Sequence, residues 1–447
     1  MKPVSLRSRT PAILSWVIAA ILLLLPFHAF LTVWLSSALG HYELLRLWKE
    51  FLLVLLMAGI IFLLKDDKAL RQRLLSSRLV QAISAYIFIT LLWGVVAYSS
   101  HQVTLKALGY GLIVNLRFLL FFIATWIVAT KSPILHKIWP KILLLPAALV
   151  IFVGLLQRFI LPYDVLKHFG YEPNTIFPYE DINHNIHYPR IMSTLRGANP
   201  LGAYMTLIIS CVAAFWLRAK KQRWLWGLFG VGAGAVLVLS YSRGAWAGTL
   251  LSLLVLLWVS INNEKYRRIM YVFLGALAVL GAILLLVLRN NSTFDNIVFH
   301  TQNGSAIKAT SDQGHASAFK SGLHDFVHEP LGRGPGTAGP ASIYNNNKPR
   351  IAENYYIQIA QEIGWLGLAL FLAINYSVAR ELWLRRKDIL ASILLASLVG
   401  IMAVNLVSHA WTDDTLSYIW WGLAGIALSA YTTNRQNSYV RKNKKQA

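Results

Sequence analysis

The sequence predicts an all-α, polytopic membrane protein with about twelve transmembrane helices. Of the 447 residues, 56% are apolar and only 14% are charged, whereas an average soluble chain carries about 25% charged residues. The apolar residues also stand in long blocks rather than in the alternating pattern of a β-barrel strand. Together these observations exclude an ordinary soluble enzyme, a disordered chain and a β-barrel. Residues 1–447 are therefore predicted to form a single integral membrane domain.

The individual spans follow from blocks that approach the roughly 20 apolar residues a helix needs to cross a bilayer. The first block begins near Ala12 and is too long for the core of a signal peptide, so we expect it to be retained. Cys211 is the only cysteine and lies inside an apolar block, which predicts neither a disulfide nor a cysteine metal site. The predicted spans are centred near residues 23, 56, 89, 118, 150, 208, 232, 253, 279, 365, 398 and 424.

The distribution of basic residues orients these spans. Most of the 42 Lys and Arg residues fall on alternate connections, beginning with the N-terminal segment and ending with the C-terminal tail. Because cytoplasmic connections are enriched in Lys and Arg, both termini are predicted to be cytoplasmic. The net charge of +23 is thereby explained by topology and predicts no nucleic-acid partner.

Two long connections fall on the predicted extracytoplasmic side, residues 161–199 and residues 289–354. Loops of this length usually carry function. The larger loop precedes the tenth predicted helix and contains a helical stretch at residues 317–328. It also contains a cluster of turn-forming residues, Gly332, Gly334, Pro335, Gly336, Gly339 and Pro340. We therefore expect a small folded cap.

A few arginines lie where the topology does not require them. Arg190 and Arg196 close the first long loop, Arg243 lies between the seventh and eighth spans, and Arg117 lies within the fourth span. An arginine near membrane depth usually faces a cavity and a partner, and its rigid donor fork matches phosphate oxygens. These residues predict a site for a lipid-linked phosphate or diphosphate; the alternatives are contacts with lipid headgroups or pairing with Asp or Glu.

The histidines offer weaker candidates. His184 and His187, in INHNIHYP, have the spacing of a metal-binding pair, but no third ligand follows at a suitable spacing, so no metal site is predicted. His315 and His328 lie on the larger loop and are candidate proton-transfer groups.

Four short motifs follow one another on the same predicted side of the membrane. They are TLRGANPLGAY at the sixth span, SRGAWAG at the eighth, HEPLGRGPG late in the larger loop, and Glu353-Asn354 ahead of GWLG in the tenth span. In this order and topology the chain resembles the O-antigen ligase and O-antigen polymerase superfamily.

The resemblance implies a glycosyltransferase at the outer face of the bacterial cytoplasmic membrane, acting in cell-surface polysaccharide biosynthesis. Such enzymes transfer a glycan from undecaprenyl diphosphate to the hydroxyl of a glycan or lipid acceptor, without a metal, a nucleotide or another cofactor. By this resemblance, the diphosphate-binding residues would be Arg190, Arg196, Arg243 and Asn354. Glu353 would be the general base, with His328 or His315 as the alternative base.

One departure from the ligase pattern matters. Ligases have His followed by Asn at the junction of the larger loop and the tenth span, whereas this chain has Glu353 followed by Asn354. The difference favours a polymerase or another transferase over a lipopolysaccharide-type ligase. A shielded carboxylate can still serve as a general base; alternatively, Glu353 is only a helix-start charge favoured by the helix dipole.

Two other functions fit the predicted topology, a twelve-helix secondary transporter and a flippase for lipid-linked glycans. Such transporters are often built from two repeated halves, but here the connection after the sixth span is only residues 218–223 and no internal repeat is visible. A flippase would use the same external arginines but does not explain a loop as long as residues 289–354.

Overall fold

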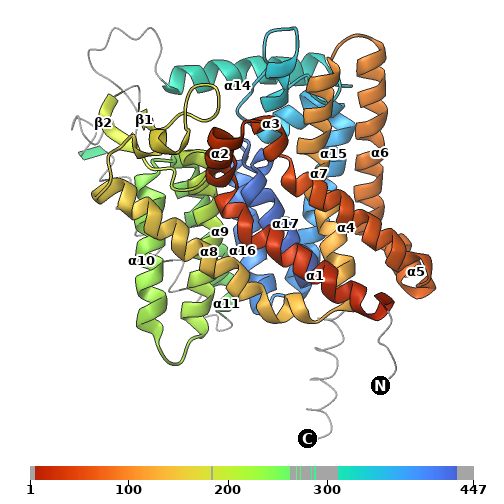
Figure 1. Ribbon diagram of the computed structural model, residues 1–447, viewed down its shortest axis with the longest axis horizontal. Coiled ribbons are helices and arrows are strands. Elements are labelled where there is room, and N and C mark those ends of the chain that lie inside the picture. Colours follow the sequence, from red (N-terminus) through yellow and green to blue (C-terminus); the bar gives the residue numbers. More distant parts are fainter. Residues whose placement is uncertain are drawn as a thin grey trace, which may run out of the picture.

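The computed structural model describes residues 6–182, 185–261 and 311–429, with isolated positions between the last two ranges. It is a bundle of long helices with a cap of short elements at one end (Figure 1). The helices are α1 (Leu6–Leu24), α2 (His28–Leu39), α3 (Tyr42–Leu45), α4 (Trp48–Lys65), α5 (Lys68–Ser76), α6 (Arg78–Ser99), α7 (Leu105–Lys131), α8 (Ile134–Phe159), α9 (Ala198–Arg218), α10 (Arg223–Leu239), α11 (Arg243–Ser260), α14 (Ser311–His328), α15 (Tyr355–Leu384), α16 (Ile389–Val404) and α17 (Asp414–Leu428). The short elements are η1 (Leu25–Phe27), η2 (Val165–Phe169), η4 (Gly339–Tyr344), η5 (Ala410–Thr412), β1 (Glu180–Ile182) and β2 (Asn185–Arg190).

The helices confirm a multi-span membrane protein. Eight helical segments in the described ranges are long and apolar enough to cross a bilayer, and α10 and α16 are shorter apolar helices. Eleven of the twelve predicted span centres fall within described helices. The ninth, near residue 279, lies outside the described residues, so the total of twelve spans stays a prediction.

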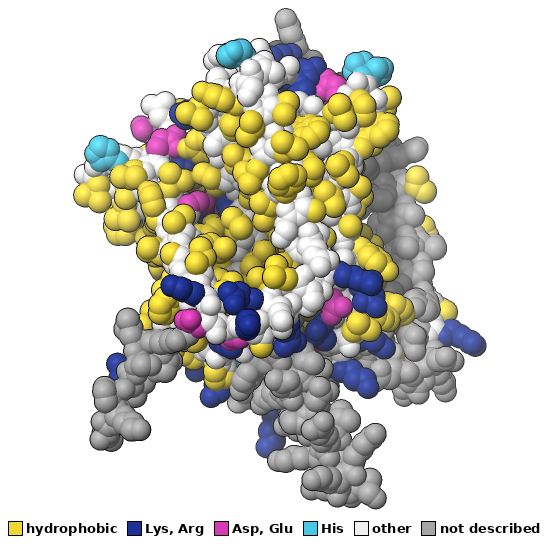
Figure 2. Space-filling view, turned by 90° about the vertical axis from the view of Figure 1, so that its right-hand side faces the viewer, with side chains coloured by type: hydrophobic (Ala, Val, Ile, Leu, Met, Phe, Trp, Pro, Cys, Tyr) yellow, Lys and Arg dark blue, Asp and Glu magenta, His cyan; other side chains and the backbone are white. Residues whose placement is uncertain are grey.

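The surface has two chemically different ends. We call the end that carries α2, α3, α14 and the β1–β2 hairpin the loop end, and the opposite end the basic end (Figure 1). Figure 2 shows Lys and Arg gathered along the lower edge, below a broad apolar band. Large apolar side chains on α4, such as Val54 and Leu55, are 67% and 64% exposed. Such exposure suits contact with lipid tails, since water would penalise it.

The expectation of an entirely helical chain is wrong in one place. Within the connection from α8 to α9, β1 and β2 form an antiparallel pair in which Glu180 lies opposite Arg190. This segment contains four prolines, Pro162, Pro173, Pro178 and Pro189. Proline lacks an amide hydrogen and breaks a continuing helix, so short extended pieces form instead.

Helices α9, α11 and α16 form a tightly packed unit whose tips reach the loop end. A Cβ added to Gly400 would lie 2.2 Å from the Gly248 carbonyl oxygen, so α11 and α16 meet backbone to backbone. Hydroxyl pairs join α9 to α11, Thr206 with Thr249 at 2.9 Å and Ser210 with Ser252 at 2.6 Å. This packing leaves the helix tips little freedom to shift.

The HEPLGRGPG segment fastens the described part of the larger loop to the bundle. Gly336 has φ of 87°, and a Cβ there would lie 2.3 Å from the Ala107 carbonyl oxygen of α7. The fully buried Glu362 of α15 accepts hydrogen bonds from the Gly336 amide and the Asn115 side chain, both at 2.7 Å. At Gly364, where φ is 71°, α15 kinks against residues 330–331 of the same segment. These glycines permit close backbone contacts that a side chain would prevent.

Gly336→Ala should therefore destabilise the protein without touching any candidate site residue. The alanine combines a left-handed backbone, which costs on the order of 1–3 kcal/mol, with a clash against α7. We expect a lower thermal unfolding temperature in detergent and reduced yield. The control is Gly109→Ala on α7, the helix that Gly336 contacts, because a Cβ added at Gly109 meets nothing within 4 Å. Equal unfolding temperatures for the two variants would contradict a role of Gly336 in fastening the loop to α7.

Candidate active site

The largest cavity that we describe lies at the loop end, with a volume of about 910 Å³. It lies where the tips of α9, α11 and α16 meet the end of β2, α14 and the segment that leads into α15. Four of the sequence-predicted site residues line it, namely Arg190, Arg243, Glu353 and Asn354. The fold thus brings together residues from both long loops and from the α10–α11 turn.

Arg190 is held in place by several described partners. Its Nε donates to the Ser240 carbonyl at 2.9 Å and its Nη2 to Asn199 Oδ1 at 2.6 Å, while Glu180 lies 3.5 Å from Nη1. Burial lowers the pKa of Arg190, and the nearby positive charge of Arg243 lowers it further, against the opposing influence of Glu180. Two neighbouring arginines of like charge are costly, and an anion between them would relieve that repulsion.

The start of α11 adds to the positive potential of this wall. Arg243 is its first residue, and Ser242 is its N-cap but makes no side-chain capping bond within the described structure. The first amide groups of a helix carry a partial positive charge and point outward, so an uncapped helix start favours an anion. Arg190, Arg243 and the α11 N-terminus therefore converge on one region of the cavity that suits phosphate oxygens.

Glu353 faces this region from the opposite segment. It is half-buried and has φ of 52°, a left-handed conformation that is uncommon for residues other than glycine. Tyr241, which also lines the cavity, has φ of 50° and occupies the matching position before α11. Strained backbone of this kind persists where the surrounding structure fixes it, often at functional sites.

Asn354 fixes the start of α15. Its Oδ1 accepts from the amides of Tyr356 and Ile357, both at 3.0 Å, and its Nδ2 donates to the Leu406 carbonyl at 2.9 Å. The side chain thus caps α15 and ties it to the end of α16. The structure gives Asn354 a positioning role for its neighbour Glu353, in addition to its place on the cavity wall.

Arg196 does not join the other arginines. It is exposed and borders a separate cavity of about 50 Å³, together with Arg46 and Arg117. The chain turns sharply between Arg190 and Arg196 at Ser193, where φ is 53°. A diphosphate role for Arg196 stays a prediction that the main cavity does not support.

Arg117 belongs to a buried cluster of charges shared by α4, α7 and α17. It pairs with Glu50 at 3.2 Å and with Asp414, and it donates to the Thr412 carbonyl at 2.7 Å. Lys49, only 2% exposed, pairs with the same two carboxylates, Asp414 at 2.7 Å and Glu50 at 3.2 Å. Of the alternatives for Arg117, pairing with acidic side chains is confirmed.

The structure does not place any of the candidate histidines in the main cavity among the side chains that it describes. His328 is exposed on α14, its ring stacks on His324 at 4.1 Å, and it does not line the main cavity. The side chain of His315 and the whole of His184 lie outside the described residues, although Ala316, next to His315, lines the cavity. Among the described residues, no group of three or more His, Cys, Asp or Glu could hold a metal ion.

Three polar residues of the site or its support were not predicted from the sequence. Asn199 orients Arg190, Tyr241 lines the cavity, and Glu362 anchors the loop. Asn199 lies within a motif already singled out, and a lone carboxylate inside an apolar span, such as Glu362, is a recognisable signal. Nothing in the sequence distinguishes Tyr241 from the other tyrosines.

Comparison with known proteins adds one result. Residues 228–372 match the family model described as O-antigen ligase. This stretch includes Arg243, Glu353 and Asn354, whereas Arg190 and Arg196 precede it. No curated protein matches the chain. The match supports the resemblance drawn from the four motifs: over residues 228–372 this multi-pass membrane protein is similar to the O-antigen ligase family.

Proposed function

We propose that this protein transfers a glycan from an undecaprenyl-diphosphate carrier to an acceptor hydroxyl at the outer face of the bacterial cytoplasmic membrane. The match of residues 228–372 to the O-antigen ligase family favours a glycosyltransferase-like enzyme acting on lipid-linked glycans. The observation that carries the finer proposal is that Arg190, Arg243 and Glu353 all line the same cavity of about 910 Å³ at the loop end. The pathway would be the biosynthesis of a cell-surface polysaccharide.

In this proposal Glu353 acts as the general base. It accepts the proton of the acceptor hydroxyl while that oxygen forms a bond to the anomeric carbon of the donor sugar. The bond between this carbon and the diphosphate oxygen breaks, and its electron pair leaves with the diphosphate. Arg190, Arg243 and the α11 N-terminus stabilise the charge that develops there, as preorganised donors do in other enzymes. The proton on Glu353 then passes to water.

The proposed orientation is supported by the chemical difference between the two ends of the bundle. The basic end suits the cytoplasm by the positive-inside rule, which leaves the loop end and its cavity outside. One side of the cavity is apolar, formed by Val404, Leu406 and Val407 at the end of α16. Leu406 and Val407 are more than half exposed. An apolar wall beside an anion site suits a diphosphate attached to a hydrocarbon chain.

Turnover should need neither a divalent metal nor a nucleotide. The leaving group is already a diphosphate, and the two cavity arginines supply the positive charge that magnesium supplies elsewhere. Purified protein in detergent should release undecaprenyl diphosphate from the lipid-linked donor at an undiminished rate in excess EDTA. A rate that falls with EDTA and returns with Mg²⁺ or Mn²⁺ would contradict the proposal.

The same assay separates the remaining alternatives. With the lipid-linked oligosaccharide as the only substrate, a polymerase lengthens the glycan, whereas a ligase turns over only when a second acceptor is added. A flippase or transporter would move the intact lipid or another solute across vesicles without breaking the diphosphate–sugar bond. Absence of bond cleavage under all these conditions would overturn the proposed function.

A further inference from the structure

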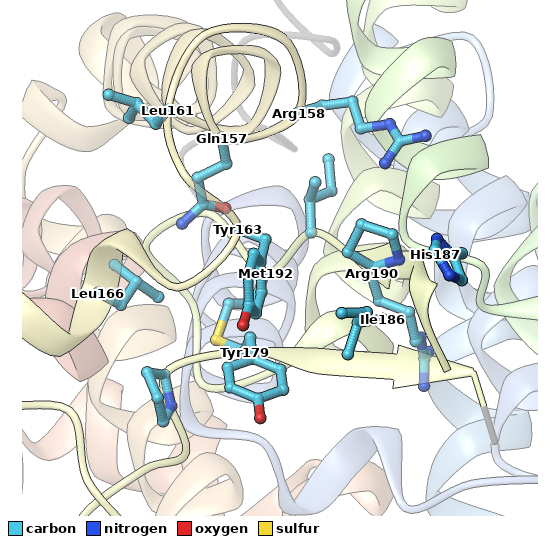
Figure 3. Close-up of a pocket in the computed structure, with 13 residues that line it drawn as sticks. Gln157, Arg158, Leu161, Tyr163, Leu166, Tyr179, Ile186, His187, Arg190 and Met192 are labelled. Carbon is cyan, nitrogen blue, oxygen red and sulfur yellow. The ribbon is translucent and has the colours of Figure 1, made fainter. Parts of the chain in front are cut away.

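A second cavity, of about 380 Å³, lies in the first long loop (Figure 3) and shares Arg190 with the main cavity. Its walls come from the end of α8, the segment after it, and β2. Leu166 and Met192, which are 4% and 1% exposed, contribute buried side chains to the lining. The volume lies within the range of roughly 300–1,000 Å³ that is typical of small-molecule sites.

Two tyrosines form an open aromatic wall of this cavity. The rings of Tyr163 and Tyr179 meet edge to face, with centroids 5.1 Å apart at 75°. They are 48% and 37% exposed, so ring surface is left available. A sugar presents an apolar face of C–H groups between its hydroxyls, and such a face packs well against an aromatic ring whose polar tip stays wet.

Polar side chains also line the cavity, to one side of the aromatic wall (Figure 3). Arg158 projects from the end of α8 and His187 from β2, both lining the cavity (Figure 3). Guanidinium and imidazole N–H groups can donate hydrogen bonds to the hydroxyl oxygens of a sugar. Gln157 is already committed to the fold, since its amide exchanges hydrogen bonds with Ser193 at 2.7 and 3.3 Å. This pair of hydrogen bonds holds the end of α8 against the segment around Ser193 and so fixes one wall of the cavity.

Arg190 connects the two cavities, because it lines both of them. In the proposed function its guanidinium contacts the donor diphosphate. The apolar α16 wall of the main cavity then lies on the prenyl side of that diphosphate, and the tyrosine-walled cavity lies beside the same arginine. On the basis of the proposed function, we infer that the smaller cavity binds the sugars of the donor glycan that lie beyond the one attached to the diphosphate, since that first sugar must reach Glu353 in the main cavity.

The competing explanation is that the tyrosines anchor the loop at the membrane surface, as interfacial aromatic residues often do. Phe177, in the same loop, is 61% exposed and does not line the cavity, so it fits that explanation. Tyr163 and Tyr179 differ because they share a walled cavity with Arg158 and Arg190. Phe177 therefore serves as the matched control for membrane anchoring.

The test compares two ligands on the full-length protein in nanodiscs. One is undecaprenyl diphosphate; the other is the undecaprenyl-diphosphate oligosaccharide that accumulates in cells lacking the gene. Tyr163→Ala and Tyr179→Ala should each weaken binding of the glycosylated ligand about tenfold, the scale of one lost aromatic contact. Binding of bare undecaprenyl diphosphate should stay unchanged, and Tyr→Phe at either position should restore most of the affinity because the ring remains.

Other outcomes overturn the inference. Equal weakening of both ligands, or the same loss in Phe177→Ala, would assign the tyrosines to loop anchoring. A higher KM for the acceptor with unchanged donor binding would place the acceptor in this cavity instead. If the parent protein binds neither undecaprenyl diphosphate nor its glycosylated form, the proposed function itself fails. That result is distinct from a failure of the sugar site alone.

Discussion

Replacing Arg243 with alanine is expected to lower turnover of the lipid-linked donor by about 10²–10³-fold, the usual effect of removing one donor to a developing charge. Arg243 begins α11 and lines the main cavity together with Arg190, whose pKa is lowered by burial and, to a lesser extent, by the charge of Arg243. Loss of its guanidinium would leave the departing diphosphate less stabilised. Initial rates of undecaprenyl diphosphate release measure the effect.

Lysine at position 243 should recover only a small part of the rate, because an ammonium group cannot reproduce the two-pronged contact of a guanidinium. Arg333→Ala is the control, since Arg333 is half-exposed on the larger loop, pairs with Glu329 and does not line the cavity. Arg196→Ala tests whether the donor site reaches the separate cavity of about 50 Å³ that Arg196 borders. Full activity of Arg243→Ala in a correctly folded protein would remove Arg243 from the donor site.

Arg190→Ala should be similarly inactive but is a less clean test. Arg190 also ties β2 to the starts of α9 and α11 through Asn199 and the Ser240 carbonyl. Alanine there would remove these structural bonds as well as the charge, so unfolding measurements must accompany the rates. Arg243 is the better position for separating chemistry from stability.

Glu353→Gln is expected to reduce turnover by about 10²–10⁴-fold, the range typical of a lost general base. Glutamine keeps the shape and hydrogen bonding of the side chain but cannot take up the acceptor proton. Donor binding should stay nearly intact, because the arginine wall is untouched. The reduction should therefore appear in kcat and leave the donor Kd close to the parent value.

Two further substitutions at this position sharpen the result. Glu353→His, which restores the ligase-type pair with Asn354, should retain more activity than glutamine. Glu353→Gly removes both the carboxylate and a left-handed backbone strain of about 1–3 kcal/mol. This variant should resist thermal unfolding at least as well as the parent and yet be inactive, which a merely structural residue would not produce.

Glu381→Gln provides a matched control at the basic end, where Glu381 pairs with Arg385 at 2.6 Å. If Glu353→Gln is as active as this control while His315→Ala or His328→Ala is inactive, the base lies on the larger loop. In that case the charge at position 353 serves only the start of α15.

Most of the helices could be predicted from the sequence because the bilayer demands long apolar blocks. Arg243, Glu353 and Asn354 could be singled out because each lies in a short motif at a span end. Arg190 and Arg196 could not be separated, since the reversal at Ser193 depends on the distant Gln157. The β1–β2 hairpin was missed because strands of three and six residues leave too short an alternating pattern.

The glycine-rich motif shows a different limit of sequence reasoning. HEPLGRGPG helped to indicate the family because it occurs in a fixed order with three other motifs. The role of its glycines, however, depends on contacts with Ala107 and Gly111 of α7, which are distant in the sequence. Close backbone approach of this kind leaves no trace in residue type beyond glycine itself. Only the three-dimensional packing shows that HEPLGRGPG holds the loop in place while the cavity lies elsewhere.

The buried cluster of Lys49, Glu50, Arg117 and Asp414 has a consequence for how the chain enters the membrane. The first three residues are synthesised and inserted with α4 and α7, long before α17 delivers Asp414. Until then two cations share one carboxylate, an excess charge that is costly within a bilayer. We therefore expect α4 and α7 to associate stably at this cluster only after α17 has been inserted. A chain truncated before residue 414 should therefore be degraded faster in the membrane than the full-length protein.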